Sequence, residues 1–188
     1  MRVIAGKARR IQLKTAEGMD TRPTTDRIKE TLFNMLGDRV YGCDFLDLYS
    51  GSGGIAIEAL SRGARSAVLV ERDRRAIACI RDNLERTHLA GQAELLCTDC
   101  EAAIDRLGRA GRRFDIIFMD PPYDHEHEKA ILSRLLGKSL ADADTLIIVE
   151  ASLETDFSYL AGMGYDLVRE KNYKTNKHMF VKVIGEIQ

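Results

Sequence analysis

The segment FLDLYSGSGG, residues 45–54, decides the fold, because it joins an apolar run of strand length to a glycine-rich turn. A helical pattern follows at residues 55–62. Glycines let backbone N–H groups approach a ligand, and the N-terminus of a helix favours an anionic group. The segment therefore predicts a strand–turn–helix unit that binds a nucleotide-like ligand.

Two cofactor classes fit this unit. Gly51-x-Gly53-x-x-Ala56, with Glu71 about twenty residues further on for a ribose, matches the dinucleotide fingerprint. A nicotinamide-dependent oxidoreductase is therefore one alternative. Asp47 argues against it, because a carboxylate inside the strand suits the ammonium of an amino-acid-bearing cofactor and offers nothing to a pyrophosphate.

Strand-like and helical patterns alternate from residue 44 onward. The expected strands are residues 45–49, 67–71, 93–97, 114–119 and 146–150. The expected helices between them are residues 55–62, 74–88, 101–107 and 128–136. This rhythm, with continuous apolar strands, predicts a mainly parallel sheet with helices on both faces. After a last helix near 156–162, alternating patterns at 165–171 and 178–184 predict a C-terminal antiparallel hairpin and a seven-stranded sheet.

Residues 1–40 are expected to form a basic N-terminal extension, and residues 41–188 the main domain. The extension combines a short hairpin, with strands near Val3 and residues 11–13, and a helix that runs from the 21–26 turn to Gly37. Lys and Arg exceed Asp and Glu by nine to five in residues 1–40 and by five to one in residues 169–182. Residues 41–168 hold fourteen against twenty-two. The two basic terminal segments and the acidic middle of the chain predict that the termini form one surface that binds a polyanion. The alternative is that these basic residues are ordinary solvated charges.

Composition narrows the class of protein further. At 188 residues the chain fits one domain, and its apolar runs are too short to span a membrane. The N-terminus lacks the apolar stretch of a signal peptide, so we expect a cytoplasmic protein. Cys97-x-x-Cys100 has no second pair or histidines at ligand spacing, so we expect no metal, and redox or metal use is a minor alternative.

Asp120-Pro121-Pro122-Tyr123 follows the apolar run 114–119 and ends the fourth strand of the expected parallel sheet. The two prolines supply no N–H and bias their predecessors toward extended geometry, so the nearby carbonyls are stiffly placed. Carboxylate, carbonyl and ring together suit a planar group that carries an NH2. The motif points to chemistry on an amino group, with a plain proline turn as the alternative.

Carboxylates also follow neighbouring strands, and together they resemble a known class of enzymes. Asp47-x-x-x-Gly51-x-Gly53, Glu71, Asp99 and Asp120-Pro-Pro-Tyr123 resemble the S-adenosylmethionine-dependent amino-methyltransferases of the Rossmann-like class. Within that class the N-terminal block resembles the RsmD family, the small-subunit rRNA guanine-N2 methyltransferases. The block comprises RVIAG (2–6), TRPT (21–24), DR (26–27), KE (29–30) and LFN (32–34). The resemblance runs essentially end to end.

The resemblance implies methyl transfer from S-adenosylmethionine to the exocyclic N2 of one guanine of 16S rRNA, guanine 966 in the family. The implied partner is 16S rRNA in an assembled or partly assembled small ribosomal subunit, with no membrane and with a monomer favoured. Another amino-methyltransferase, acting on adenine N6 or on a guanine of a different RNA, is the main alternative. A non-catalytic RNA-binding module is a further one.

The expected site residues fall into three groups. The catalytic residues are Asp120, Pro121, Pro122 and Tyr123. The cofactor-binding residues are Asp47, Tyr49, Gly51, Gly53, Glu71, Arg72, Asp99, Cys100 and Asp120. The RNA-binding residues are Lys7, Arg9, Arg10, Lys14, Arg22, Arg27, Lys174 and Lys177.

Overall fold

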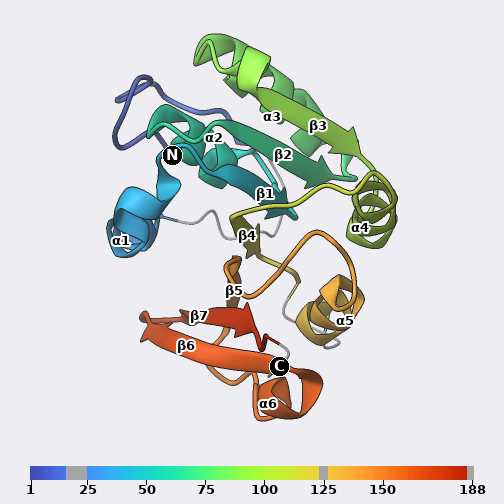
Figure 1. The fold of residues 1–188 in the computed structure, drawn as a ribbon. Helices are drawn as coiled ribbons and strands as arrows, with labels where there is room; N and C mark the ends of the chain where they lie inside the picture. The colour runs from blue at the N-terminus through green and yellow to red at the C-terminus, as the bar shows by residue number, and fades with distance from the viewer. Residues whose placement is uncertain (16–24, 123–126, 186–188) are drawn as a thin grey trace. The chain divides into compact units, whose positions relative to one another are not determined.

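The computed structural model describes residues 1–15, 25–122 and 127–185. They fall into two compact units, Met1–Asp99 and Cys100–Gln188 (Figure 1). Each unit is built on its own group of strands. None of the helices in the described part of the chain has the length and hydropathy needed to cross a bilayer.

The first unit contains three parallel strands in the order β3-β2-β1. Its elements are α1 (Asp26–Leu36), β1 (Asp44–Leu48), α2 (Gly54–Ser61), β2 (Ser66–Glu71), α3 (Arg74–Arg86) and β3 (Ala93–Cys97). Short 3₁₀ turns cover Gly37–Val40 and Ala90–Gln92. The Thr25 hydroxyl caps α1 by accepting from the Ile28 N–H, and Gly37, with a φ of 53°, ends it. The predicted helix that closes at Gly37 is therefore confirmed.

The second unit carries four strands in the order β4-β5-β7-β6. Its elements are α4 (Cys100–Arg109), β4 (Ile116–Met119), α5 (His127–Leu135), β5 (Leu146–Ser152), α6 (Leu160–Met163), β6 (Tyr165–Asn172) and β7 (Asn176–Val183). β4 and β5 are parallel, whereas β7 pairs antiparallel with both β5 and β6. The predicted C-terminal hairpin is therefore confirmed, with a tighter connection than the sequence suggested.

Both faces of the central strands are covered. Val68, Leu69 and Val70 of β2 are all fully buried, and so are Ile147 and Ile148 of β5. Successive side chains of a strand point to opposite faces, so a strand with no exposed residue has cover on each side. The described residues form seven strands, and the pairs β1–β2, β2–β3 and β4–β5 are parallel. Together with the burial, this pairing confirms the predicted fold class.

Most element boundaries lie within two residues of the expected ones, and two of the differences have a clear physical cause. β4 begins at Ile116 rather than residue 114, because the Phe114 N–H donates to the Leu140 carbonyl at 3.1 Å instead of joining the sheet. The helix expected near 156–162 is only the short α6. Asp156 explains the late start, since its carboxylate accepts from the Ser158 N–H and hydroxyl and so forms a local turn.

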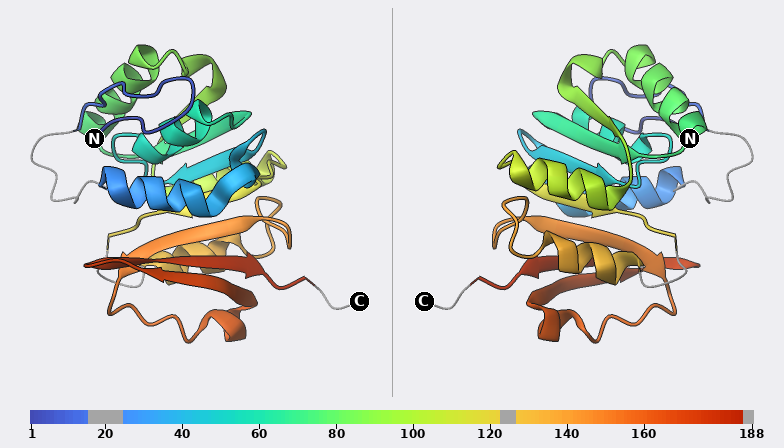
Figure 2. Two further views of the ribbon diagram at one scale, coloured as in Figure 1. Left: turned by 90° about the vertical axis from the view of Figure 1, so that its left-hand side faces the viewer. Right: turned by 90° about the vertical axis from the view of Figure 1, so that its right-hand side faces the viewer.

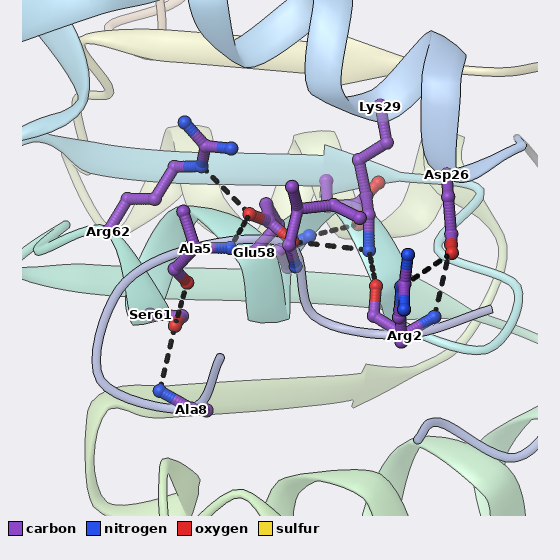
Figure 3. Close-up of polar contacts among 11 residues, drawn as sticks. Arg2, Ala5, Ala8, Asp26, Lys29, Glu58, Ser61 and Arg62 are labelled. Atoms are coloured by element: carbon purple, nitrogen blue, oxygen red, sulfur yellow. Dashed lines mark hydrogen bonds and ion pairs between the residues drawn. The ribbon is translucent and has the colours of Figure 1, made fainter. Parts of the chain in front are cut away.

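The basic N-terminal segment is a hairpin that lies on the first unit, beside α2 and α3 (Figure 2). Arg2 and Gln12 form an antiparallel bridge, and the Val3 N–H donates to the Ile11 carbonyl at 3.0 Å. Ser61 of α2 holds its far end, because the Ser61 hydroxyl donates to the Ala5 carbonyl at 2.6 Å and accepts from the Ala8 N–H at 2.9 Å (Figure 3). The segment is thus packed onto the helix that follows the glycine turn.

A buried ion pair fixes the start of this segment. The Lys29 ammonium of α1 lies 3.2 Å from the Glu58 carboxylate of α2, and neither side chain is exposed (Figure 3). Glu58 also accepts from the N–H groups of Ile4 and Ala5, at 2.8 and 3.0 Å, and from the Arg62 guanidinium. Burial lowers the pKa of Lys29 and Glu58 opposes that shift, so the ammonium depends on this carboxylate.

We expect Glu58→Gln to lower the free energy of unfolding by about 3–5 kcal/mol, because it leaves a buried ammonium without its counter-charge. Urea unfolding at pH 7 would measure the change. Arg86→Gln is the control, since it alters the Arg86–Asp82 pair, whose side chains are 41% and 37% exposed and which does not involve Lys29. That control should cost at most about 1 kcal/mol. Equal effects of the two variants would contradict the role assigned to Glu58.

Candidate functional site

The turn between β1 and α2 is held in a fixed shape by Ser50. The Ser50 N–H donates to the Val70 carbonyl at 3.0 Å, and the Val70 N–H donates to the Ser50 hydroxyl at 3.0 Å. That hydroxyl donates in turn to the Asp47 carbonyl at 2.7 Å. These bonds join the ends of β1 and β2, so the turn that follows starts from a rigid base.

Backbone geometry explains the glycines of the turn. Gly53 has a φ of 79°, and a Cβ there would come within 3.1–3.4 Å of the side chains of Leu69, Ile57 and Ile80. Gly51 has a φ of 55°, but a Cβ there would meet nothing within 4 Å. The turn is therefore packed on one side and open at Gly51, as a loop that receives a ligand against its backbone requires. The backbone of Tyr49 also lies in the left-handed region, with a φ of 64°.

Glu71, at the end of β2, faces the same turn. Its carboxylate accepts from the Gly51 N–H at 2.9 Å, and from the N–H groups of Arg72 and Asp73 at 2.8 and 2.9 Å. A carboxylate offers about four lone-pair sites, so these three bonds leave acceptor capacity for a ligand hydroxyl. Glu71 thus ties the glycine turn to the start of α3 and remains suited to a ribose.

The Asp47 carboxylate is buried away from solvent. Its side chain is 1% exposed, and Oδ2 accepts from the Ala56 N–H in the first turn of α2 at 3.2 Å. Burial raises the pKa of Asp47 to about 8, Ala56 opposes that shift, and the nearby charge of Glu71 adds to it. A cation brought next to this group would favour its ionised form, as the ammonium of an amino-acid-bearing ligand would.

The remaining predicted cofactor residues follow β2 and β3 along the chain. Arg72 follows β2 and is exposed, and Asp99 follows β3 and is exposed. Cys100 is buried as the first residue of α4, whereas Cys97 is exposed. No group of three or more His, Cys, Asp or Glu suited to a metal ion occurs within residues 1–15, 25–122 and 127–185.

In the second unit, the amino-group motif begins directly after β4. Asp120 is partly exposed, Pro121 is buried and Pro122 is exposed. Tyr123 lies outside the described residues. The structure therefore brings together Asp47, Gly51, Gly53 and Glu71 within the first unit. In the second unit, Asp120 and the two prolines follow the end of β4.

The predicted RNA-binding residues differ in their exposure. Those at the described surface are Lys7, Arg9, Arg10, Lys14, Arg27 and Lys174. Arg22 lies outside the described residues. Lys177 is not a solvated cation: it is 9% exposed, and its Nζ lies 5.4 Å from the centre of the Phe157 ring. It packs against the protein, so we leave it out of the proposed RNA surface.

Sequence reasoning missed Asn83, which bonds to both the N-terminal segment and the glycine turn. One signal was present. Asn83 lies three residues after Ile80 and seven after Ala76, on the face of α3 that is otherwise apolar and buried. A polar residue at such a position needs partners from other elements, and only the tertiary structure identifies them.

Comparison with known proteins assigns the chain to one family. A sequence-family model described as Conserved hypothetical protein 95 matches residues 1–182. The chain is 38% identical over 175 residues to "Putative rRNA methyltransferase YlbH" of Bacillus subtilis, covering 92% of this chain and 94% of that protein. It is 33% identical over 171 residues to "Ribosomal RNA small subunit methyltransferase D" of Escherichia coli, covering 91% and 84%.

The fold agrees with these relatives. The solved structure of "Putative methyltransferase yhhF from Escherichia coli" superposes with a TM-score of 0.83 at 29% identity, and the match covers 99% of each chain. The predicted Rossmann-like methyltransferase architecture is therefore confirmed.

Asp47→Asn should stabilise the ligand-free protein increasingly as the pH rises from about 4 to about 8. In that window the unfolded carboxyl, with its ordinary pKa of 3.8, loses its proton while the folded one, near 8, keeps it, so the wild type loses stability. The gap between variant and wild type should reach a few kcal/mol and level off above pH 8. Urea unfolding at several pH values would measure it. Asp38→Asn, at an exposed carboxyl, serves as control, and a pH-independent gap for Asp47→Asn would contradict the prediction.

Proposed function

The chain belongs to the family of ribosomal RNA small subunit methyltransferase D, and on this premise we propose that it methylates RNA with S-adenosylmethionine as donor. More finely, we propose the exocyclic N2 of one guanine of 16S rRNA as acceptor, guanine 966 in the family. The observation that carries the proposal is the open glycine turn with Glu71 bonded across it, in a chain that matches this family over residues 1–182.

The residues around the turn fit the proposed cofactor. S-adenosylmethionine, when bound, supplies an electrophilic methyl group on a sulfonium. Asp47 would hold its ammonium, and the buried carboxyl would then be ionised. Glu71 would accept from the ribose hydroxyls, and Asp99 from the adenine amino group. Tyr49, Gly51, Gly53, Arg72 and Cys100 complete the proposed cofactor surface.

Asp120 and its neighbours would prepare the amine. The nitrogen lone pair of guanine N2 is delocalised into the ring, which makes it a poor nucleophile. Asp120 and the Pro121 carbonyl would accept its two hydrogens and favour a pyramidal nitrogen, while Pro122 stiffens the backbone and Tyr123 stacks on the base. The methylated, cationic amine is acidic enough to lose its proton to water, so the role assigned to Asp120 is orientation.

The basic N-terminal extension would bind the RNA backbone. Lys7, Arg9 and Arg10 are exposed at the hairpin, and Lys14, Arg22, Arg27 and Lys174 would add phosphate contacts. The target guanine must lie in a loop or be turned out of its stack to reach a catalytic pocket. We further propose residues 1–40 as the RNA-facing part of a cytoplasmic monomer that acts on an assembled or partly assembled small subunit.

Incubation of the protein with labelled S-adenosylmethionine and unmodified small ribosomal subunits, followed by nucleoside analysis, tests the proposed reaction. Label in N2-methylguanosine is the expected result. Label in N6-methyladenosine would overturn the choice of base, and no transfer to either subunits or free 16S rRNA would overturn the function.

Asp120→Ala should reduce methyl transfer at least about a hundredfold, because the amine loses the group that orients it. The affinity for S-adenosylhomocysteine should stay within a few-fold of wild type, which calorimetry would measure. Asp115→Ala, at an exposed carboxyl just before β4, is the matched control and should remain active. Full activity of Asp120→Ala would contradict the role given to Asp120.

Arg9→Ala and Arg10→Ala should each weaken binding to the subunit and reduce the slope of log affinity against log salt by roughly one unit. Neither should change the affinity for S-adenosylhomocysteine. Arg86→Ala, at an exposed arginine of α3 paired with Asp82, is the control. If both hairpin variants keep the wild-type salt slope, the hairpin does not contact phosphates.

A further inference from the structure

Both polar atoms of the Asn83 side chain, in α3, form hydrogen bonds to two segments that lie far from it in sequence. The side chain is fully buried. Its Nδ2 donates to the Ser52 carbonyl in the glycine turn and to the Lys14 carbonyl in the N-terminal segment, each at 2.9 Å. Its Oδ1 accepts from the Lys14 N–H at 2.8 Å. One side chain therefore joins the proposed cofactor turn to the proposed RNA-binding segment.

The energetics of burial make this junction stiff. A buried amide or carbonyl that loses its partner costs about 1–3 kcal/mol. Displacement of Lys14 would leave Asn83 and the Lys14 backbone unsatisfied together, and displacement of Ser52 would do the same on the other side. Movement of either segment away from Asn83 therefore carries an energetic cost.

A second contact joins the same two segments. A Cβ at Gly54, the first residue of α2, would come within 2.5 Å of the Met1 sulfur, so the Met1 side chain packs directly against the end of the glycine turn. The Met1 carbonyl accepts from the Leu13 N–H at 3.0 Å, next to Lys14. Both ends of the hairpin thus reach the turn, one through Met1 and the other through Asn83.

Lys14 also offers a charge to a ligand. Its side chain is 58% exposed, and its Nζ lies 3.0 Å from the carboxylate of Asp82, the neighbour of Asn83. An exposed pair of this kind is weak, so a phosphate can compete for the ammonium. A phosphate bound to the Lys14 ammonium would restrain Lys14, and the backbone of this residue is bonded to Asn83.

We propose that Asn83 is a positioning residue that couples RNA binding by residues 1–14 to cofactor binding by residues 49–53. This inference rests on the proposed function. Either ligand orders the segment it touches, and the shared side chain reduces the ordering that the other ligand must cause. Each ligand therefore raises the affinity for the other, and by the same factor, because linkage is reciprocal.

The test measures this factor in the wild type from both directions. The dissociation constant of labelled S-adenosylhomocysteine is determined with and without saturating unmodified small subunits, and that of the subunits, by co-sedimentation, with and without S-adenosylhomocysteine. The two ratios should agree at roughly fivefold or more. Hydrogen exchange of the Lys14 amide should slow when S-adenosylhomocysteine alone is added, an effect that a purely structural role would not produce.

Asn83→Ala and Asn83→Asp should bring the factor close to one. The second variant keeps an acceptor for the Lys14 N–H and loses both donated bonds. Ser61→Ala is the matched control, because Ser61 holds the same segment through Ala5 and Ala8. It should keep the factor, and circular dichroism would establish that each variant is folded.

Several outcomes would overturn the inference. They are a wild-type factor of one, a factor retained by the folded Asn83 variants, and an equal loss in Ser61→Ala. If the Asn83 variants do not fold, the wild-type factor and the Lys14 exchange decide. Failure of S-adenosylhomocysteine or of the subunits to bind at all would instead defeat the proposed function, and this inference with it.

Discussion

The Glu58 carboxylate gathers four donors inside the first unit: the Lys29 ammonium, the Arg62 guanidinium and the N–H groups of Ile4 and Ala5. A buried charge is tolerated only when its partners surround it, so these groups must be in place together. Glu58 lies one helical turn after Gly54, where α2 begins. One carboxylate therefore fixes α1 and the N-terminal segment to the helix that leaves the glycine turn.

The glycine turn is stabilised from several sides at once. Ser50 closes its base against β2, Glu71 accepts from its Gly51 N–H, and Asn83 donates to its Ser52 carbonyl. A Cβ built at Gly51 would still meet nothing within 4 Å, so the turn has open space beside this residue. Each of these bonds limits the entropic cost of binding a ligand at the turn, and the one from Asn83 is shared with the N-terminal segment.

Sequence patterns predicted most of the fold because they report local physics. The apolar runs of β1, β2 and β5 and the periodicity of α1 and α3 depend only on which side chains avoid water. The errors have two different causes: Phe114 leaves β4 for the carbonyl of the distant Leu140, and a local turn at Asp156 shortens α6. For the site, Asp47, Gly51, Gly53 and Glu71 were predicted as a set, but the burial that raises the pKa of Asp47 was not.

By itself the sequence determined the order of strands and helices, the glycine turn, the acidic strand ends and the basic N-terminal segment, because each is a property of consecutive residues. Only the tertiary structure decided which buried polar groups meet. Lys29 and Glu58 are twenty-nine residues apart, and Asn83 meets Lys14 across sixty-nine. Such pairs produce no periodic pattern in the sequence, because the two partners come from distant elements. Their stability depends on the water-free surroundings that the folded protein provides.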